Sequence, residues 1–316
     1  MEHLPIHFFR LYSFENMQTR RSSFRFLALC FFTLVALTAC HEPDDITPDD
    51  ELLVNDNQNP PETYARRLEM PALDNRNTFI THTTLFKGKE TITYSLEYDE
   101  KLHHSKWVAF TFYDDTNERN WSRSNWYSTS WGGDPFQKDP QLSNYACPDR
   151  SYFSGSGGVR GHICASADRL YSKEANEQTF YYSNMSPMSF DFNGGFWADL
   201  EIALRDTWAY KQTFCDTLYV VKGGTIRQGE YRMSDNGRLP IPNYYFMALL
   251  CRKNGTYKSI GFWVEHKPYL NKTFLDCAVS IDKLEELTGI DFFCNLPDKV
   301  ESAVEGSCYP GVWGLN

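Results

Sequence analysis

An alternation of polar and apolar residues early in the chain predicts a β-hairpin. Residues 78–86 and 90–98 both alternate in this way, and a Lys-Gly-Lys sequence at 87–89 separates them. A short glycine-containing connection between two alternating runs is typical of a tight turn between antiparallel strands. The run at 107–113, WVAFTFY, is almost wholly apolar and predicts a third strand that is mostly buried.

Two later segments have the apolar spacing of helices. In residues 195–210, apolar side chains recur every three or four positions, which predicts a helix with one buried face. The segment 280–288 predicts a short helix that Ser280 or Asp282 caps and Gly289 ends. Short apolar or aromatic runs predict further strands at 179–183, 217–221, 244–251 and 259–265.

The order of these elements indicates the fold class. Helices and strands do not alternate regularly, so the pattern favours an α+β domain, with a mostly antiparallel sheet flanked by helices, over a doubly wound sheet. Residues 117–157 are polar, rich in Trp and Tyr and interrupted by Gly and Pro, so we expect long surface loops there. With 316 residues and 41% hydrophobic content, the chain can form one domain with a full-sized core, predicted at 62–316.

The N-terminal region has the features of an export signal. Three arginines within residues 20–25 precede an apolar run at 26–39 that is too short to span a bilayer. A basic segment followed by such a run is typical of a signal peptide, which we place at residues 1–39. The stretch ahead of the arginines is unusually long, so Met17 is a second candidate for the first residue.

The end of the apolar run, LTAC, resembles the lipobox of bacterial lipoproteins. The resemblance implies that Cys40 is lipidated and anchors an exported protein to a membrane. The protein would face the periplasm or the cell surface, with the outer membrane expected; the alternative is an ordinary signal peptide in which Cys40 is incidental. Residues 40–61 are acidic, contain four prolines and lack aromatic side chains, so they predict a flexible tether.

The charge of the chain argues against a globally basic nucleic-acid binder. The formal net charge is −10, and residues 57–316 alone carry 27 basic and 32 acidic residues, a net of −5. A protein that holds nucleic acid over a wide surface is usually basic. If the substrate is nucleic acid, a local basic cleft must bind it.

The segment 160–205 holds the side chains best suited to catalysis. It contains a His beside an Arg, followed by asparagines, a glutamate and a second Arg. A neutral His accepts a proton from water, an Asn oxygen ligates a hard cation, and Arg binds phosphate oxygens. Together these groups suit metal-assisted hydrolysis of a phosphodiester.

Each of these residues also has an ordinary structural interpretation. A lone His next to Arg, such as His162, is usually structural or solvated. Glu201 and Arg205 are four positions apart on a predicted helix and suit a surface ion pair. Asn193 precedes that helix and suits an N-cap. No single residue therefore identifies the site.

What distinguishes the set is its order and spacing along the chain. Four motifs follow one another: Arg160-Gly161-His162, Ser183-Asn184-Met185-Ser186-Pro187, Asn193-x-Gly195-x-Trp197 and Leu200-Glu201-x-x-x-Arg205. Jointly they resemble the DNA/RNA non-specific endonuclease family, whose active site is a ββα-metal motif. The resemblance covers roughly residues 78–300, from the WVAFTF run to a late strand and helix at 276–289.

The resemblance implies roles at a metal ion. His162 matches the general base that activates water. Asn193 matches the sole direct protein ligand of a catalytic Mg²⁺, for which Mn²⁺ is an alternative. Glu201 matches the acid that holds water in the shell of the metal ion.

Further positions match phosphate-binding and accessory residues. Arg160 and Arg205 match arginines that contact phosphate, and Asn184 matches an accessory active-site Asn. The family also has an upstream Arg in a loop before an aromatic residue and an Asp-Pro step. Arg123, in RSNW, fits this position best, and Arg119, in ERNW, is its rival.

One position departs from the family. Its motif usually begins Asp-Arg-Gly-His, whereas this chain has Val159 before Arg160. The retention of the other site residues favours an active Mg²⁺-dependent enzyme that hydrolyses DNA and RNA without sequence preference. The alternatives are a phosphodiesterase of the same fold that acts on nucleotides or small diesters, and a catalytically silent surface binding module.

Seven cysteines follow the lipobox, and an odd number leaves at least one thiol unpaired. An exported protein can form disulfides. The family resemblance supports a bridge from Cys277 to a near-terminal cysteine, which is Cys308, with Cys294 as the competing partner. Cys164 is either a partner of Cys147 or a small buried thiol.

Overall fold

The structure is a computed structural model that describes residues 54–62, 64–128, 133–267 and 272–316. The predicted signal peptide, the alternative start at Met17 and the lipobox with Cys40 lie outside the described residues. Within those residues, no helix is both long and apolar enough to cross a membrane.

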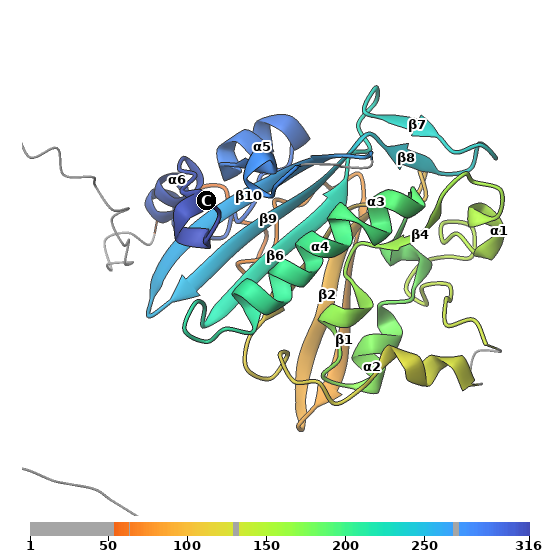
Figure 1. The fold of residues 1–316 in the computed structure, drawn as a ribbon, viewed down its shortest axis with the longest axis horizontal. Coiled ribbons are helices and arrows are strands. Elements are labelled where there is room, and N and C mark those ends of the chain that lie inside the picture. Colours follow the sequence, from red (N-terminus) through yellow and green to blue (C-terminus); the bar gives the residue numbers. More distant parts are fainter. Residues whose placement is uncertain (1–53, 63, 129–132, 268–271) are drawn as a thin grey trace, which may run out of the picture. The chain divides into compact units, whose positions relative to one another are not determined.

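A seven-stranded sheet forms the centre of the described domain (Figure 1). Each pair of neighbouring strands is antiparallel. This confirms the predicted α+β fold with a mostly antiparallel sheet flanked by helices. In spatial order the strands are β1 (Thr78–Phe86), β2 (Lys89–Asp99), β3 (His104–Phe112), β6 (Thr217–Gly224), β9 (Tyr244–Lys253), β10 (Thr256–Glu265) and β11 (Ala278–Val279).

The β1–β2 hairpin follows from its turn residues. Lys87 and Gly88 both have positive φ, 51° and 74°, which a two-residue turn needs in order to match the twist of its strands. Strands also form at the other predicted positions with shifted ends, as β3, β6, β9 and β10. The pattern of apolar residues therefore locates the main strands of the sheet.

Side chains alternate between the two faces of the sheet, and different helices pack on each face. On one face, Val108 and Val220 share a buried core with Trp197 and Leu200 of α4 (Phe196–Ala203). Figure 1 shows α4 lying along this face of the sheet. The candidate site residues are on the same face.

The opposite face is covered by α5 (Ile281–Thr288) and α6 (Asp298–Glu305). Leu284 of α5 and Val300 of α6 share a second buried core with Val221 of β6. The sheet is thus the middle of three layers.

The helix α5 begins and ends as its sequence predicts. The Ser280 hydroxyl accepts a hydrogen bond from the Lys283 backbone N–H, which makes Ser280 the N-cap. Gly289 ends the helix with φ 67°, a left-handed conformation that glycine adopts without strain.

The helix predicted at 195–210 forms in two parts. After α4, the chain continues as a π-helix over Leu204–Ala209. A separate short helix, α3 (Phe190–Gly194), precedes α4. The remaining named elements are β4 (Val159–His162) paired with β5 (Met185–Met188), β7 (Tyr231–Met233) paired with β8 (Pro240–Pro242), α1 (Arg150–Phe153) and α2 (Lys173–Gln178).

The strand predicted at 179–183 is wrong. Thr179 ends α2, and Tyr182–Asn184 form a 3₁₀ turn. The segment takes part in one isolated bridge, between Gln137 and Tyr181. Its aromatic side chains reflect the burial of a turn rather than the edge of a sheet.

The predicted Cys277–Cys308 disulfide is also wrong, because both residues are unbonded. The disulfide in the structure joins Cys215 to Cys251. Cys215 lies just ahead of β6 and Cys251 lies in β9 opposite Leu218, so strand pairing brings the two sulfur atoms together. The other described cysteines without a disulfide are Cys147, Cys164 and Cys294.

The last part of the predicted tether packs onto the domain. The Asn55 side-chain amide donates to the carbonyl oxygens of Cys294 and Leu296, at 2.9 and 2.5 Å. Asn59 is buried, with 4% of its surface exposed. The folded domain therefore starts ahead of the predicted boundary at residue 62.

Candidate active site

Two short strands and two helices hold the candidate catalytic residues. β4 pairs antiparallel with β5, with His162 opposite Met185, and the chain then enters α3 and α4. His162 lies at the end of β4, Asn193 in α3 and Glu201 in α4. This succession of two strands and a helical segment is the ββα arrangement that the family resemblance implies.

Two glycines permit the close packing of this unit. A Cβ atom at Gly161 would overlap the Met188 side chain, which reaches over β4 from β5. A Cβ atom at Gly195 would overlap the Asp191 carbonyl oxygen. Gly195 has φ −110° and ψ −117°, so the chain changes direction between α3 and α4.

His162 lies in an aromatic pocket with an unpartnered ring nitrogen. Its ring packs against Phe136 and Phe180, with centroid separations of 5.6 and 5.1 Å. Its Nε2 atom is buried and has no hydrogen-bond partner among the described residues. Burial, followed by the positive charges of Arg123 and Lys222, holds the pKa of His162 well below its ordinary value. The imidazole is therefore neutral at neutral pH and can accept a proton.

Asn193 caps neither of the helices around it. It lies in the last turn of α3, whose N-cap is Ser189, and the N-cap of α4 is Gly195. Its side chain is half-buried and forms no hydrogen bond with the described residues. The amide oxygen of Asn193 is consequently available to a ligand.

Glu201 is held by Lys222, a buried lysine that the sequence analysis did not single out. Lys222 forms an ion pair with Glu201 Oε1, is fully buried, and has its ammonium 5.1 Å from the centre of the Trp197 ring. Burial raises the pKa of Glu201, while Lys222 and Arg205 oppose the rise. The sequence did contain one indication of this ion pair. A single lysine lies inside the apolar strand at 217–224, where a buried charge is unfavourable unless it is paired.

Arg205 pairs with Asp168 and not with Glu201. Arg205 Nη1 lies 2.7 Å from Asp168 Oδ1, and the Asp168 side chain is fully buried. Asp168 also accepts a hydrogen bond from the Ala165 backbone N–H at 3.2 Å. Arg205 is thus fixed to the loop that follows His162, and its remaining guanidinium nitrogens have no hydrogen-bond partner in the described parts of the chain.

Asn184 braces the same loop. Its Oδ1 accepts from the Cys164 backbone N–H at 2.8 Å, and its Nδ2 donates to the carbonyl oxygens of Cys164 and Thr179 at 2.9 and 2.8 Å. The side chain is fully buried. These bonds use three of the four that an amide side chain can form, so Asn184 positions the backbone after His162.

Arg160 is held by a carboxylate from a separate loop. Its Nη1 donates to both oxygens of Asp134, at 3.1 and 3.0 Å, and its guanidinium lies 3.7 Å from the centre of the Phe136 ring. Val159, which stands where the family has Asp, pairs with Met188 in the β4–β5 ladder. Arg160 therefore has an acidic partner even though the residue before it is apolar.

The placement of the two candidate upstream arginines differs. Arg123 and Arg160 line one pocket of 420 Å³, and the charge of Arg123 acts on His162. Arg119 lies 4.8 Å from the centre of the Tyr210 ring. Arg123 thus lies on the Arg160 side of the candidate site, and Arg119 lies beside Tyr210, whose pKa is raised by burial and then by Asp168, while Arg205 lowers it.

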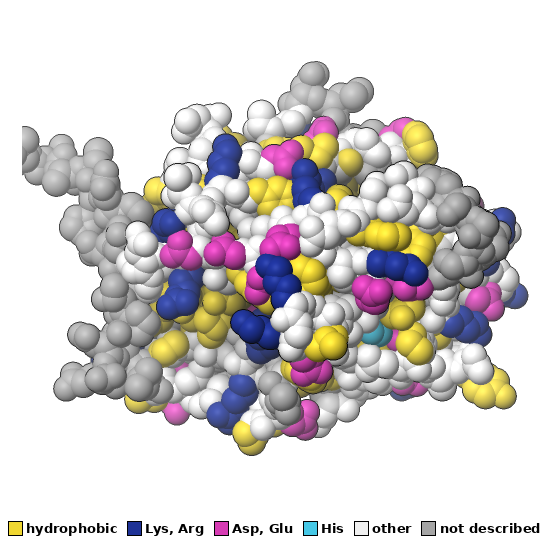
Figure 2. Space-filling model, turned by 90° about the horizontal axis from the view of Figure 1, so that it is seen from below, with side chains coloured by type: hydrophobic (Ala, Val, Ile, Leu, Met, Phe, Trp, Pro, Cys, Tyr) yellow, Lys and Arg dark blue, Asp and Glu magenta, His cyan; other side chains and the backbone are white. Residues whose placement is uncertain are grey.

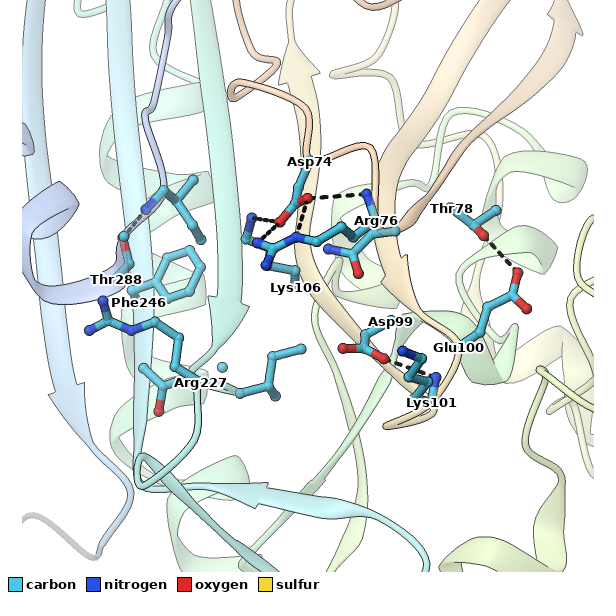
Figure 3. A pocket seen from close by; sticks show the side chains of 16 residues that line it. Asp74, Arg76, Thr78, Asp99, Glu100, Lys101, Lys106, Arg227, Phe246 and Thr288 are labelled. Carbon is cyan, nitrogen blue, oxygen red and sulfur yellow. Dashed lines mark hydrogen bonds and ion pairs between the residues drawn. The ribbon is translucent and has the colours of Figure 1, made fainter.

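A larger pocket, of 570 Å³, lies where β2 and β6 end (Figure 3). Three of its charged side chains pair with each other: Arg76 and Asp74 are 2.5 Å apart, and Lys106 lies 3.6 Å from the same carboxylate. Phe246, which also lines it, belongs to the core on the face opposite α4. This pocket contains none of the predicted site residues.

Comparison with known proteins identifies the family. The model of the DNA/RNA non-specific endonuclease family matches residues 75–299. The chain belongs to this family. Membership makes it a hydrolytic nuclease, with nucleic acid as its class of substrate, in a family that generally depends on a divalent metal.

Individual relatives are distant. A nuclease of Nostoc sp. is 28% identical over 222 residues, which are 67% of this chain and 75% of the relative. The mitochondrial nuclease EXOG of Xenopus laevis is 25% identical over 227 residues, 66% of this chain and 59% of the relative. The mitochondrial nuclease of Saccharomyces cerevisiae is 32% identical over 171 residues, 49% and 51% of the two chains. The chain thus spans between half and three quarters of these relatives.

A solved structure shares the fold. A chain in the crystal structure of the EndoG/EndoGI complex superposes with a TM-score of 0.55 at 18% identity, covering 70% of this chain and 89% of that chain. At this identity the likeness shows the fold alone.

The residues present fit a divalent metal. Asn193 offers an unpaired amide oxygen, and hard cations prefer oxygen ligands. Glu201 offers a carboxylate on the next helix, and the unpartnered Nε2 of His162 belongs to the same ββα unit.

The surface carries mixed charge. On the face shown in Figure 2, Lys and Arg side chains lie among Asp and Glu and do not merge into one basic patch. This agrees with the net charge of −5 for residues 57–316, where 27 basic and 32 acidic residues are present. This face therefore offers no broad basic area for binding phosphate.

Proposed function

We propose that the protein is an endonuclease that uses Mg²⁺, with Mn²⁺ as an alternative, to hydrolyse phosphodiester bonds of both DNA and RNA without sequence preference. The observation that carries most weight is the buried, unpartnered Nε2 of His162, in the same ββα unit as the unpaired amide of Asn193. A buried polar atom without a partner is unfavourable for stability, so its presence supports a functional role.

His162 supplies the base. Its imidazole accepts a proton from a water molecule while the water oxygen attacks phosphorus, and the bond from phosphorus to the 3′ oxygen breaks. The products carry a 5′-phosphate and a 3′-hydroxyl group, whose proton comes from solvent. The lowered pKa of His162 keeps the ring neutral before this step.

Asn193 and Glu201 organise the water and the metal. Asn193 would hold the cation through its amide oxygen, and the bound ion would act as a Lewis acid that stabilises negative charge on the phosphate. Glu201 accepts hydrogen bonds from water in the site, and its ion pair with Lys222 fixes the carboxylate in place.

Three arginines bind the phosphate. Arg160 and Arg205 each use one guanidinium nitrogen for Asp134 and Asp168, which leaves the others for phosphate oxygens. Arg123 adds a third positive charge in the Arg160 pocket. Contacts to phosphate carry no base information, which accounts for cleavage without sequence preference.

A nuclease assay tests this function. The purified protein should cleave both plasmid DNA and RNA with Mg²⁺ or Mn²⁺ and lose this activity in EDTA. His162→Ala should lower turnover by about two to four orders of magnitude without loss of folding, the usual range for a general base. Near-normal turnover of the variant would show that the base lies elsewhere.

The net negative charge favours one other candidate, a phosphodiesterase of the same fold that acts on nucleotides or small diesters. Hydrolysis of bis(p-nitrophenyl) phosphate with no cleavage of plasmid or RNA would support that candidate over the endonuclease. Comparable specific activity on polymeric substrates would exclude it.

We further propose that residues 1–39 are removed and that lipidated Cys40 anchors the exported protein to a membrane, in the periplasm or at the cell surface, with the outer membrane expected. The support is the basic segment, the short apolar run and LTAC. Cys40→Ser should abolish incorporation of a labelled fatty acid and release the protein from the membrane fraction. Unchanged labelling of the variant would contradict the anchor.

A further inference from the structure

A cluster of carboxylates lies between α5 and α6, the neighbouring helices on the sheet face opposite α4 (Figure 1). Asp282 and Glu285 come from α5, and Glu305 is the last residue of α6. One oxygen of each carboxylate lies within 4.8 Å of those of the other two. Ionised carboxylates this close repel each other unless they take up protons or share a cation.

Glu305 sets this cluster apart from ordinary surface acids. Only 4% of the residue is exposed, and its Oε1 is buried without a hydrogen-bond partner among the described residues. Burying a charged carboxylate without a partner is strongly unfavourable. A glutamate held there, facing two further carboxylates, indicates a missing partner.

The side chains around Glu305 are acidic as well. Burial, and then the charges of Glu285, Glu301, Asp291 and Asp282, raise the pKa of Glu305 to about 11. A positive charge at the centre of the cluster would reverse this repulsion.

No basic side chain supplies that positive charge. In the described parts of the chain, no Lys or Arg forms an ion pair with Asp282, Glu285 or Glu305. Lys283 is paired with Glu286 on the exposed side of α5. A cation from solvent is therefore the available partner for these carboxylates.

We propose that Asp282, Glu285 and Glu305 form a calcium site that joins α5 to α6 and is separate from the catalytic metal. All its ligands are carboxylate oxygens, the type that Ca²⁺ prefers, and water would complete its six to eight ligands. Asp282 is exposed, so the ion has a route from solvent. Glu285 Oε1 already accepts the Phe292 backbone N–H at 2.7 Å, which leaves its second oxygen for the ion.

The type of ligand favours Ca²⁺ over Mg²⁺. Ca²⁺ accepts several carboxylates in variable geometry, whereas Mg²⁺ requires near-ideal octahedral geometry and usually keeps several water ligands. Three carboxylate oxygens that all lie within 4.8 Å of one another are close enough to share one ion.

Thermal unfolding of the full chain, stripped of metal with EDTA, tests the site. Ca²⁺ at a hundredfold excess over its Kd should raise the Tm by roughly 5–10 °C, and Mg²⁺ at equal concentration should raise it less. Glu305→Gln should remove the Ca²⁺ effect. Without metal this variant should unfold near the Tm of the parent protein, because the raised pKa of Glu305 already keeps that side chain neutral at neutral pH.

Two control variants and one further ligand variant complete the test. Glu286→Gln removes a charge from the same helix outside the cluster and should keep the full Ca²⁺ shift. Asn193→Ala should also keep it, which separates this site from the catalytic one. Asp282→Asn changes an exposed residue and should weaken Ca²⁺ binding measured by calorimetry at least tenfold. Absence of a shift in the parent protein, or a shift that survives Glu305→Gln, would overturn the proposal.

Discussion

Asn193 offers the clearest separation of catalysis from stability. Because it caps no helix and bonds to no described side chain, Asn193→Ala should change the free energy of unfolding by no more than about 0.5 kcal/mol. The same change should lower Mg²⁺-dependent turnover by roughly 100-fold or more, since it removes the proposed ligand. Turnover and thermal unfolding of one preparation give both quantities. A variant that is less stable and still cleaves with Mg²⁺ would mean that the ligand is another residue.

Lys222 should set the pH range of the enzyme. Its charge lowers the pKa of His162, so Lys222→Met should raise that pKa. A base with a higher pKa is protonated at higher pH, and the acid limb of kcat/KM should therefore move to higher pH. The pH profile of kcat/KM measures this shift. Lys106→Met is the matched control, because Lys106 pairs with Glu97 at 3.2 Å and Asp74 at 3.6 Å; its profile should be unchanged.

The motif spacing located His162, Asn193 and Glu201, because their family order is preserved in the sequence. It did not reveal what those residues touch. The ion pair of Arg205 with Asp168 spans 37 positions, and that of Lys222 with Glu201 spans 21. Such pairs depend on how β6, α4 and the loop after β4 pack together, which local spacing does not encode.

Among the secondary-structure elements, the long periodic ones were predictable and the short ones were not. β1, β2 and α5 have enough residues to show a period and have distinctive turn or cap residues. β4 and β5 have four residues each, and β5 contains Pro187, so neither shows an alternation that stands out. These two strands nevertheless present His162, and only the family motif pointed to them.

The disulfide also acts at the level of secondary-structure elements, because it joins the segment before β6 to β9. Removing the Cys215–Cys251 bridge, whose ends are 36 positions apart, should lower the free energy of unfolding by about 3–4 kcal/mol on the chain-entropy account. Urea unfolding of Cys251→Ser measures the loss. Cys308→Ser alters a half-buried free thiol and should have little effect. Peptide mapping that links Cys277 to Cys308 would contradict this assignment.

The mixed surface charge has consequences for the molecule as a whole. If three arginines make the phosphate contacts, log kcat/KM on duplex DNA should fall against log salt concentration with a slope of about −3, since each contact contributes about −0.9. The slope is measured at fixed Mg²⁺. A small diester substrate serves as the control and should show little dependence. A slope near −8 would require a wide basic surface, which the structure does not show in Figure 2.

The first described residues are fastened to the last part of the domain. Asn55 bonds to the Cys294 and Leu296 carbonyl oxygens, and Asn57 Nδ2 lies 3.2 Å from Glu301 Oε1. A force applied through the chain ahead of residue 54 therefore acts first on these contacts beside α6. The catalytic residues lie on the other side of the sheet, so a force applied at residue 54 acts on these contacts before it reaches His162.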